Sequence, residues 1–230
     1  MKYDHIQTGI FMSRPNRFLA HVELEGKMAV CHVKNTGRCK ELLIPGVTVL
    51  VQHHPDALNQ GRKTEYSLIG VYKETKEGTV LINMDSQAPN QVAAEWLKKK
   101  EEISDVKREV TYGASRFDLA FAVNGKPAFM EVKGVTLEKE GVAMFPDAPT
   151  QRGIKHLHEL SEATCHGYEA YVLFVIQMKG VTRFTPNMET HPEFGQALKE
   201  ASAAGVHILA YDCVVTENGL EIDQPVLVDI

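Results

Sequence analysis

The sequence predicts a two-domain protein of the α+β type, with a small β-barrel followed by a mixed β-sheet flanked by helices. Before about residue 88 the chain consists of short β-rich runs between turn residues, with no convincing long helix. After that point helical and strand patterns alternate. A length of 230 residues with 43% hydrophobic side chains is enough for two cores. We therefore expect domains at residues 1–87 and 88–230.

Five strands are expected in the first domain, at residues 17–24, 27–34, 47–54, 65–73 and 78–85. Turn pairs separate them, namely Glu25-Gly26, Glu77-Gly78 and, at the end of a longer connection, Pro45-Gly46. Five short strands without a long helix are typical of an OB-like barrel. An SH3-like barrel fits the same periodicity nearly as well.

The second domain is expected to contain three helices, at residues 90–103, 148–167 and 191–205. Strand patterns occur at residues 107–113, 116–123, 127–137, 168–178 and 206–216, with Asn124-Gly125 as a hairpin turn between two of them. The run at 168–178 is almost entirely apolar, as expected for a strand buried on both faces. This order of elements indicates a mixed sheet covered by helices.

The charge of the chain excludes one class of nucleic-acid binder. The 25 Lys and Arg against 30 Asp and Glu give a net charge of −5, which does not fit a uniformly basic protein. Residues 1–88, however, carry 11 basic and 9 acidic side chains, a net +2, and residues 89–230 carry the remaining −7. A local basic groove on the barrel is therefore compatible with the overall charge.

The location is predicted to be cytoplasmic. No run approaches the 18 to 20 apolar residues that span a bilayer, and the first twenty residues lack the apolar core of a signal peptide. The lack of such an apolar run also predicts no membrane partner. The four cysteines contain no C-x-x-C pair, so we expect reduced thiols. A homodimer is compatible with the sequence.

A pattern of charged residues in the second domain indicates phosphodiester chemistry. Asp118 lies on one predicted strand. The following predicted strand contains the sequence Glu131, Val132 and Lys133. Side chains at i and i+2 of a strand share a face, and the hairpin can bring Asp118 opposite Glu131. Two such carboxylates, with the Val132 carbonyl, form a site for Mg²⁺ or Mn²⁺, which would polarise a phosphodiester and activate water. Lys133 would orient that water or stabilise the transition state.

The alternative for this pattern is a solvated pair of charges on an exposed strand. The neighbouring residues argue against it, because Phe117, Leu119 and Phe121 alternate with Asp118, and Phe129 and Met130 precede Glu131. Charged side chains beside so apolar a hairpin are costly unless they have partners.

Several ordered motifs resemble the SfsA family of sugar fermentation stimulation proteins. They are RFLAHVE at 17–23, CHVKNTGRCKELLIPG at 31–46, REVTYGASRFDLAF at 108–121, FMEVKGVTL at 129–137, MFPDAPTQRGIKHLHEL at 144–160 and VHILAY at 206–211. The resemblance implies an OB-like barrel joined to a restriction-endonuclease-like domain of the PD-(D/E)XK type, non-specific DNA binding and an effect on sugar, chiefly maltose, metabolism. It also implies that Asp118, Glu131 and Lys133 are the nuclease-type triad. By the same resemblance, Glu95 on the preceding helix is a further catalytic acid.

Basic side chains that would contact DNA are expected on both domains. In nuclease-type folds the helix after the Glu-x-Lys strand faces the metal site, which makes Arg152, Lys155 and His156 candidate phosphate contacts. Arg116 either pairs with Asp118 or contacts a phosphate. On the barrel the candidates are Arg17, Lys34 and Arg38, and the scarcity of nearby aromatic residues favours contacts with the backbone over base stacking.

Three functions are compatible with these patterns. The leading prediction is a DNA-binding protein with a divalent-metal-dependent nuclease site. The second is a non-catalytic, non-specific DNA-binding regulator of sugar metabolism on a nuclease scaffold. A third is an enzyme acting on a small phosphorylated substrate.

Overall fold

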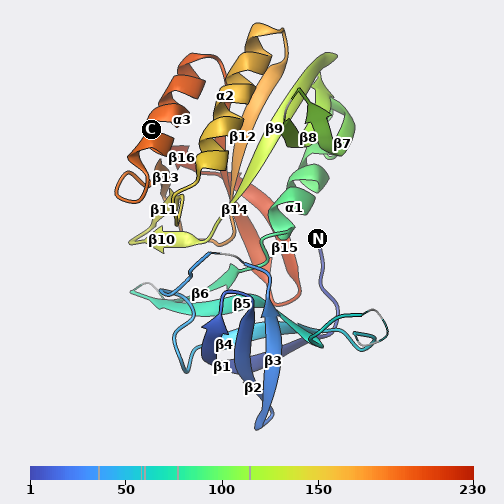
Figure 1. Cartoon of the computed structure of the whole chain (residues 1–230), viewed down its shortest axis with the longest axis vertical. Helices are drawn as coiled ribbons and strands as arrows, with labels where there is room; N and C mark the ends of the chain where they lie inside the picture. Colours follow the sequence, from blue (N-terminus) through green and yellow to red (C-terminus); the bar gives the residue numbers. More distant parts are fainter. Residues whose placement is uncertain (36, 58, 60, 77, 114) are drawn as a thin grey trace.

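The computed structural model describes every residue except Thr36, Leu58, Gln60, Glu77 and Ala114. Two sheet-based halves are stacked along the long axis of the molecule (Figure 1). The strands up to residue 83 form the lower half, and the elements from residue 88 onward form the upper half. The turn expected at Glu77-Gly78 includes one residue outside the described part.

The N-terminal half is a six-stranded sheet in the order β3-β2-β1-β4-β5-β6. Parallel pairing of Cys31, His32 and Val33 with Tyr66, Ser67 and Leu68 joins β3 to β5 and closes the first five strands into a barrel. The strands are β1 (Ile6–Asn16), β2 (Leu19–Leu24), β3 (Lys27–Val33), β4 (Thr48–His53), β5 (Tyr66–Thr75) and β6 (Gly78–Asn83).

The expected count of five strands is too low, because it omits β1. This strand pairs with both β2 and β4 and is part of the closed barrel, whereas β6 lies at the edge of the sheet and, among the described residues, pairs only with β5. Its outward residues include Ile10 and Met12, both exposed. Its apolar side chains therefore face both sides, and the inside-outside alternation that identifies a strand is weak there.

The C-terminal half has a mixed six-stranded sheet in the order β15-β14-β12-β9-β8-β7. The strands β9, β12 and β14 are parallel, and the pairs at both edges are antiparallel. Bounds are β7 (Ile103–Tyr112), β8 (Ser115–Val123), β9 (Lys126–Val135), β12 (Glu169–Ile176), β14 (His207–Thr216) and β15 (Gly219–Pro225). The mixed sheet with helices agrees with the expectation from sequence.

Helices cover both faces of this sheet (Figure 1). Helix α1 (Ala88–Leu97) packs on one face, and α2 (Gln151–Cys165) and α3 (Pro192–Ala203) pack on the other. Pro89 and Pro192 lie in the first turns of α1 and α3, where a missing N–H costs no hydrogen bond. Thr150 caps α2 by accepting a hydrogen bond from the Gly153 amide at 3.0 Å. Among the described helices, none has the length and apolar character needed to cross a membrane.

A third, small sheet was not expected from the sequence. It has the order β10-β11-β13-β16 and consists of β10 (Leu137–Lys139), β11 (Val142–Phe145), β13 (Arg183–Pro186) and β16 (Leu227–Val228). These strands are two to four residues long, too short for a periodic pattern. Lys73 of the barrel pairs with Glu138 of β10 at 2.5 Å, so this sheet also contacts the N-terminal half.

A buried polar network joins the two halves. The Gln177 amide, at the end of β12, donates hydrogen bonds to Asn83 Oδ1 at 2.9 Å and to the Asp85 carbonyl at 3.1 Å. Asp85 also accepts from Lys34 Nζ at 2.9 Å and from the Tyr3 hydroxyl at 3.4 Å. Since Asp85 lies just before α1, this network fixes the start of α1 against both the barrel and the sheet.

Candidate functional site

The candidate site lies where β8 and β9 separate. Their antiparallel pairing runs from Val123↔Lys126 to Leu119↔Met130 and stops there. Beyond it β9 continues beside β12, while β8 continues beside β7. Asp118 and Glu131 are the next residues on the two strands, so they flank the opening between them.

A kink in β8 creates this opening. Phe117 packs in the core beneath α2, while Leu119 and Phe121 pack in the core beneath α1, although a regular strand would put all three on one face. Glu109, between the β7 residues that pair with Phe117 and Leu119, has φ of 57°, a left-handed conformation that breaks the regular pleat. The alternation expected from sequence therefore fails at Asp118.

Asp118 is held from both sides of the opening. Its Oδ2 accepts a hydrogen bond from the Val132 amide at 2.8 Å, and its Oδ1 accepts one from Asn90 Nδ2 of α1 at 2.7 Å. The first bond uses a β9 amide at the point where the ladder with β8 has ended. Each Asp118 oxygen keeps a second lone pair for another ligand.

Glu131 is the most deeply buried charged group of the site, with 4% of its surface exposed. Its Oε1 accepts hydrogen bonds from Lys133 Nζ at 2.6 Å and from His156 Nδ1 at 2.5 Å. Its Oε2 is buried and has no hydrogen-bond partner among the described residues. An unpartnered buried carboxylate oxygen is costly, so this atom indicates a missing ligand.

His156 supports Glu131 from α2. The Arg152 Nε–H donates to His156 Nε2 at 3.4 Å, which leaves the Nδ1–H to donate to Glu131. His156 is 5% exposed, whereas Arg152 is exposed one turn earlier on the same helix. The structure thus places His156 behind the carboxylate, although the sequence suggested a phosphate contact.

The two carboxylates have pKa values shifted in opposite directions. Burial and the nearby Glu131 charge raise the pKa of Asp118, against the opposing effect of the hydrogen bonds that it accepts. Burial also acts to raise the pKa of Glu131, but the hydrogen bond from His156 and the positive charge and hydrogen bond of Lys133 outweigh it and hold that pKa below its ordinary value. Glu131 is therefore ionised, and a cation would relieve the repulsion at Asp118.

Glu95, the acid expected from the resemblance, is not brought to this group. Its carboxylate accepts hydrogen bonds from the Met1 amine at 2.8 Å and from Gln91 at 2.9 Å. Asn90, five residues earlier on α1, is the helix residue that contacts Asp118. Asn90 is the first residue of the helix expected at 90–103, and its amide side chain at that position was the available clue.

The other cations predicted to contact DNA from the C-terminal half, Arg116, Arg152 and Lys155, are exposed. The Arg116 guanidinium lies 3.5 Å from the Glu109 carboxylate on β7. Arg116 therefore pairs with Glu109, and of its two expected roles the salt bridge to Asp118 is not formed. Lys155 pairs with Glu159 one turn further along α2 at 3.6 Å and keeps 57% of its side chain exposed. With Arg152, it gives α2 a basic face beside the site.

The basic residues of the barrel divide into two kinds. Lys34 is engaged by the buried Asp85 and is largely enclosed, with 18% of its side chain exposed. Arg17 and Arg38 are exposed, and the Arg14 guanidinium holds their segments together by donating to the carbonyls of Arg17 at 2.8 Å and Arg38 at 2.6 Å. A Cβ added at Gly37 would clash with the Asp147 carboxylate, so this loop lies against the segment that leads into α2.

The donor set restricts what the site can hold. No group of three or more His, Cys, Asp or Glu side chains suited to a metal ion occurs in the described part of the chain. Two carboxylates, with a backbone carbonyl as the expected third ligand, are oxygen donors of the kind that Mg²⁺, Mn²⁺ and Ca²⁺ prefer.

Comparisons with known proteins agree along the whole chain. Residues 12–82 match the model of the SfsA N-terminal OB domain, and residues 87–219 match that of the sugar fermentation stimulation protein RE domain. The OB family model supports the OB-like expectation over the SH3-like one.

Two relatives named sugar fermentation stimulation protein homolog, from Desulfitobacterium hafniense (strain Y51) and Clostridium beijerinckii, are 58% and 54% identical to the chain. Each alignment covers 96% of this chain, and it covers 95% and 96% of the respective relatives. The solved structure of Pyrococcus furiosus SfsA in complex with Ca²⁺ has a TM-score of 0.85 and 28% identity, and covers 100% of this chain and 98% of that one. The chain therefore belongs to the SfsA family of sugar fermentation stimulation proteins.

Proposed function

We propose that this protein binds DNA and hydrolyses its phosphodiester bonds at a divalent-cation site formed by Asp118, Glu131 and the Val132 carbonyl, with Lys133 as the catalytic cation. The observation that carries the proposal is the buried, unpartnered Oε2 of Glu131 beside a second, half-buried carboxylate and a lysine. Such a group is unstable as a purely structural ion pair and suits a cation bound between the two acids.

The residues present fit a divalent cation. Asp118 and Glu131 supply negative oxygens, and the hydrogen bonds from Asn90 and His156 restrict the rotation of both carboxylates. The Pyrococcus furiosus relative is described in complex with Ca²⁺, which supports a cation site in the family. Mg²⁺ or Mn²⁺ is the proposed resident ion, since either would polarise the phosphodiester and lower the pKa of a bound water.

The side chains of the site have distinct roles in this proposal. Lys133, now bonded to Glu131, would turn toward the phosphate as the cation takes over the neutralisation of that carboxylate, and would stabilise the negative charge of the transition state. Arg152 and Lys155 would bind phosphates next to the scissile one, because both are exposed on the face of α2 beside the site. His156 would keep Glu131 in position.

Three features favour a polymer over a small phosphorylated substrate. The site is an opening at the edge of diverging strands, the exposed Arg152 and Lys155 of α2 lie beside it, and an OB domain, a fold that commonly binds oligonucleotides, lies next to it. We also propose that the division into residues 1–87 and 88–230 separates a nucleic-acid-binding domain from a PD-(D/E)XK nuclease-like domain.

The test is incubation of the purified protein with labelled DNA and Mg²⁺ or Mn²⁺, beside the Lys133→Ala variant. The expected result is cleavage by the wild type only, with cation binding retained in the variant. Equal amounts of product from both proteins would contradict the catalytic proposal.

A second candidate is a DNA-binding regulator that does not cleave. The name of the relatives describes an effect on sugar fermentation and no nucleolytic activity, which favours this alternative. It predicts that DNA binding survives Glu131→Ala and that no product appears with any cation.

A further inference from the structure

Four side chains converge on the outward face of the barrel wall, beside the joint between the two halves; three are half-buried and the fourth, a serine, is fully buried. They come from three segments, β3, the connection between β4 and β5, and β5 itself. We call this group the barrel cation cluster; it consists of His32, His54, Arg62 and Ser67.

Ser67 is the centre of the cluster. The parallel pairing of β3 with β5 sets His32 directly beside Ser67, so both side chains leave the same face of the barrel. The Ser67 Oγ accepts a hydrogen bond from Arg62 Nη2 at 2.8 Å and lies 3.0 Å from His54 Nε2. Because Arg62 is the donor in the first bond, the hydroxyl proton is free to go to His54, which is then neutral.

The cluster has more positive than negative groups. Arg62 forms no ion pair with any described residue, and its Nε donates to the Thr64 carbonyl at 3.4 Å. The nearby Lys34 is already neutralised by Asp85 at 2.9 Å. Burial, followed by the charges of Arg62 and Lys34, lowers the pKa of both His32 and His54, with His53 adding to the effect on His54 and Asp85 opposing it on His32. An anion would stabilise this arrangement.

The position of the cluster connects it to the candidate site. Lys34 follows β3 directly and bonds to Asp85, and the Asp85 carboxylate accepts from the Gln87 amide at 2.9 Å at the start of α1. One turn further, Asn90 bonds to Asp118. The cation cluster and the carboxylate pair are thus linked through the first turn of α1.

We propose that the barrel cation cluster binds a backbone phosphate of the same DNA whose scissile phosphate lies at Asp118, Glu131 and Lys133. This contact rests on the proposed DNA-binding function and specifies where the barrel meets the DNA. Arg62 would turn from Ser67 to the phosphate, and His54 would bind it in the protonated form. The barrel contact is thereby assigned chiefly to Arg62 and His54, which the sequence did not single out, and Lys34 has a structural role in place of direct binding.

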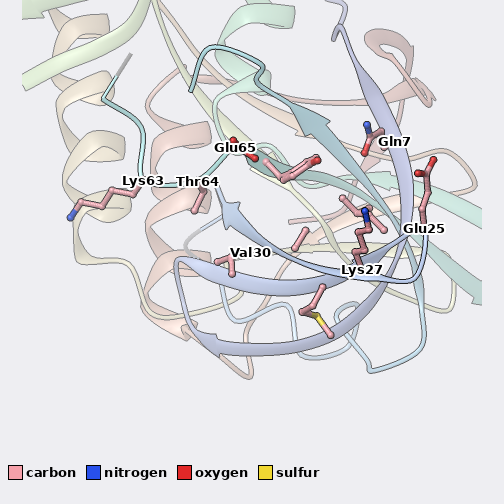
Figure 2. Close-up of a pocket in the computed structure, with 11 residues that line it drawn as sticks. Gln7, Glu25, Lys27, Val30, Lys63, Thr64 and Glu65 are labelled. Atoms are coloured by element: carbon pink, nitrogen blue, oxygen red, sulfur yellow. The ribbon is translucent and has the colours of Figure 1, made fainter. Parts of the chain in front are cut away.

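The experiment measures the binding of a fluorescent DNA duplex by anisotropy, with Ca²⁺ as the cation, over a range of salt concentrations. Arg62→Ala is expected to weaken binding by about 5- to 10-fold and to reduce the slope of log affinity against log salt by about 1. Lys63→Ala is the matched control, because it removes the same charge one residue away. Lys63 lines a separate pocket of about 550 Å³ between the β2–β3 hairpin and residues 63–66 (Figure 2).

The protonation of His54 gives a second readout that does not depend on Arg62. Wild-type binding should tighten as the pH falls from about 8 to about 6, since the bound phosphate raises the pKa of His54, and His54→Gln should flatten that response. Equal affinity and salt slope for Arg62→Ala and Lys63→Ala, with no change in the pH response of His54→Gln, would overturn the assignment. No DNA binding by the wild type would overturn the proposed function itself, and with it this contact.

Discussion

At the scale of single residues, ionised Asp118 has a stability cost at neutral pH that a bound cation would remove. Burial and the Glu131 charge raise the pKa of Asp118, so its ionised form is less stable in the folded chain than in the unfolded one. This penalty is fully present above the folded-state pKa and disappears below the unfolded-state pKa.

Asp118→Asn should therefore raise the Tm of the cation-free protein at neutral pH, by about 2–4 °C, and the gain should shrink as the pH becomes acidic. The same variant should lose the Tm increase that Ca²⁺ or Mn²⁺ gives the wild type. Thermal melts with and without cation measure both effects, and Asp56→Asn, at an exposed aspartate, is the control. A lower Tm with the cation effect preserved would contradict this role of Asp118.

His156 offers a second test at this scale. Asn places an amide N–H near the position of the histidine Nδ1–H, whereas Leu removes the hydrogen-bond donor. His156→Asn should therefore retain most of the affinity for the cation, and His156→Leu should lower that affinity by about 10-fold or more. Calorimetric titration with Ca²⁺ measures the difference. Equal affinities of the two variants would show that the bond to Glu131 does not position the ligand.

At the scale of elements, the close approach of α1 to β9 sets the position of Asn90. Gly134 on β9 permits it, since a Cβ there would lie 2.6 Å from Gln177 Oε1 and 2.8 Å from Pro89 Cγ. Gly134→Ala should lower the free energy of unfolding by about 1–3 kcal/mol. Gly70→Ala on β5, where the nearest atom is the flexible Leu50 Cδ1 at 3.3 Å, should cost less in the same denaturant titration. Similar losses for both variants would contradict the tight α1–β9 contact.

The elements also show what could be predicted from sequence. The apolar run of β12 and the turn-bounded strands of the barrel were identifiable, because burial on one or both faces leaves a periodic pattern. The kink of β8 was not, because it depends on the left-handed backbone of Glu109 on the neighbouring strand. The Asp118, Glu131 and Lys133 group was found from spacing, whereas Asn90 and the support from His156 depend on how two helices pack.

At the scale of the whole molecule, the two halves are joined by buried polar contacts that include a lysine predicted to contact DNA. Lys34→Met would leave the Asp85 carboxylate, 2% exposed, without its cation. We expect a loss of about 3 kcal/mol in the free energy of unfolding and little change in DNA affinity of the folded fraction. Denaturant titration with anisotropy on the same samples separates the two. Unchanged stability with lost DNA binding would restore Lys34 as a direct contact.

The distribution of charge between the two halves is compatible with the proposed contacts to DNA and to a cation. A net −5 excludes indiscriminate basic binding, but it leaves room for local positive charge, at Arg62 in the barrel cation cluster and at the exposed Arg152 of α2. Part of the negative charge of the C-terminal half is the carboxylate pair itself. The protein thus combines local basic surfaces with an acidic site that a cation would neutralise.

Every proposed role in the C-terminal half depends on Asp118 and Glu131 holding a divalent cation, and a crystal grown with Mn²⁺ and measured at an anomalous wavelength is the sharpest test. We expect an anomalous peak within bonding distance of Glu131 Oε2, an Asp118 carboxylate oxygen and the Val132 carbonyl, with Lys133 Nζ released from Glu131. A fully occupied Mn²⁺ site elsewhere, with Glu131 Oε2 still unliganded, would contradict the proposed cation site.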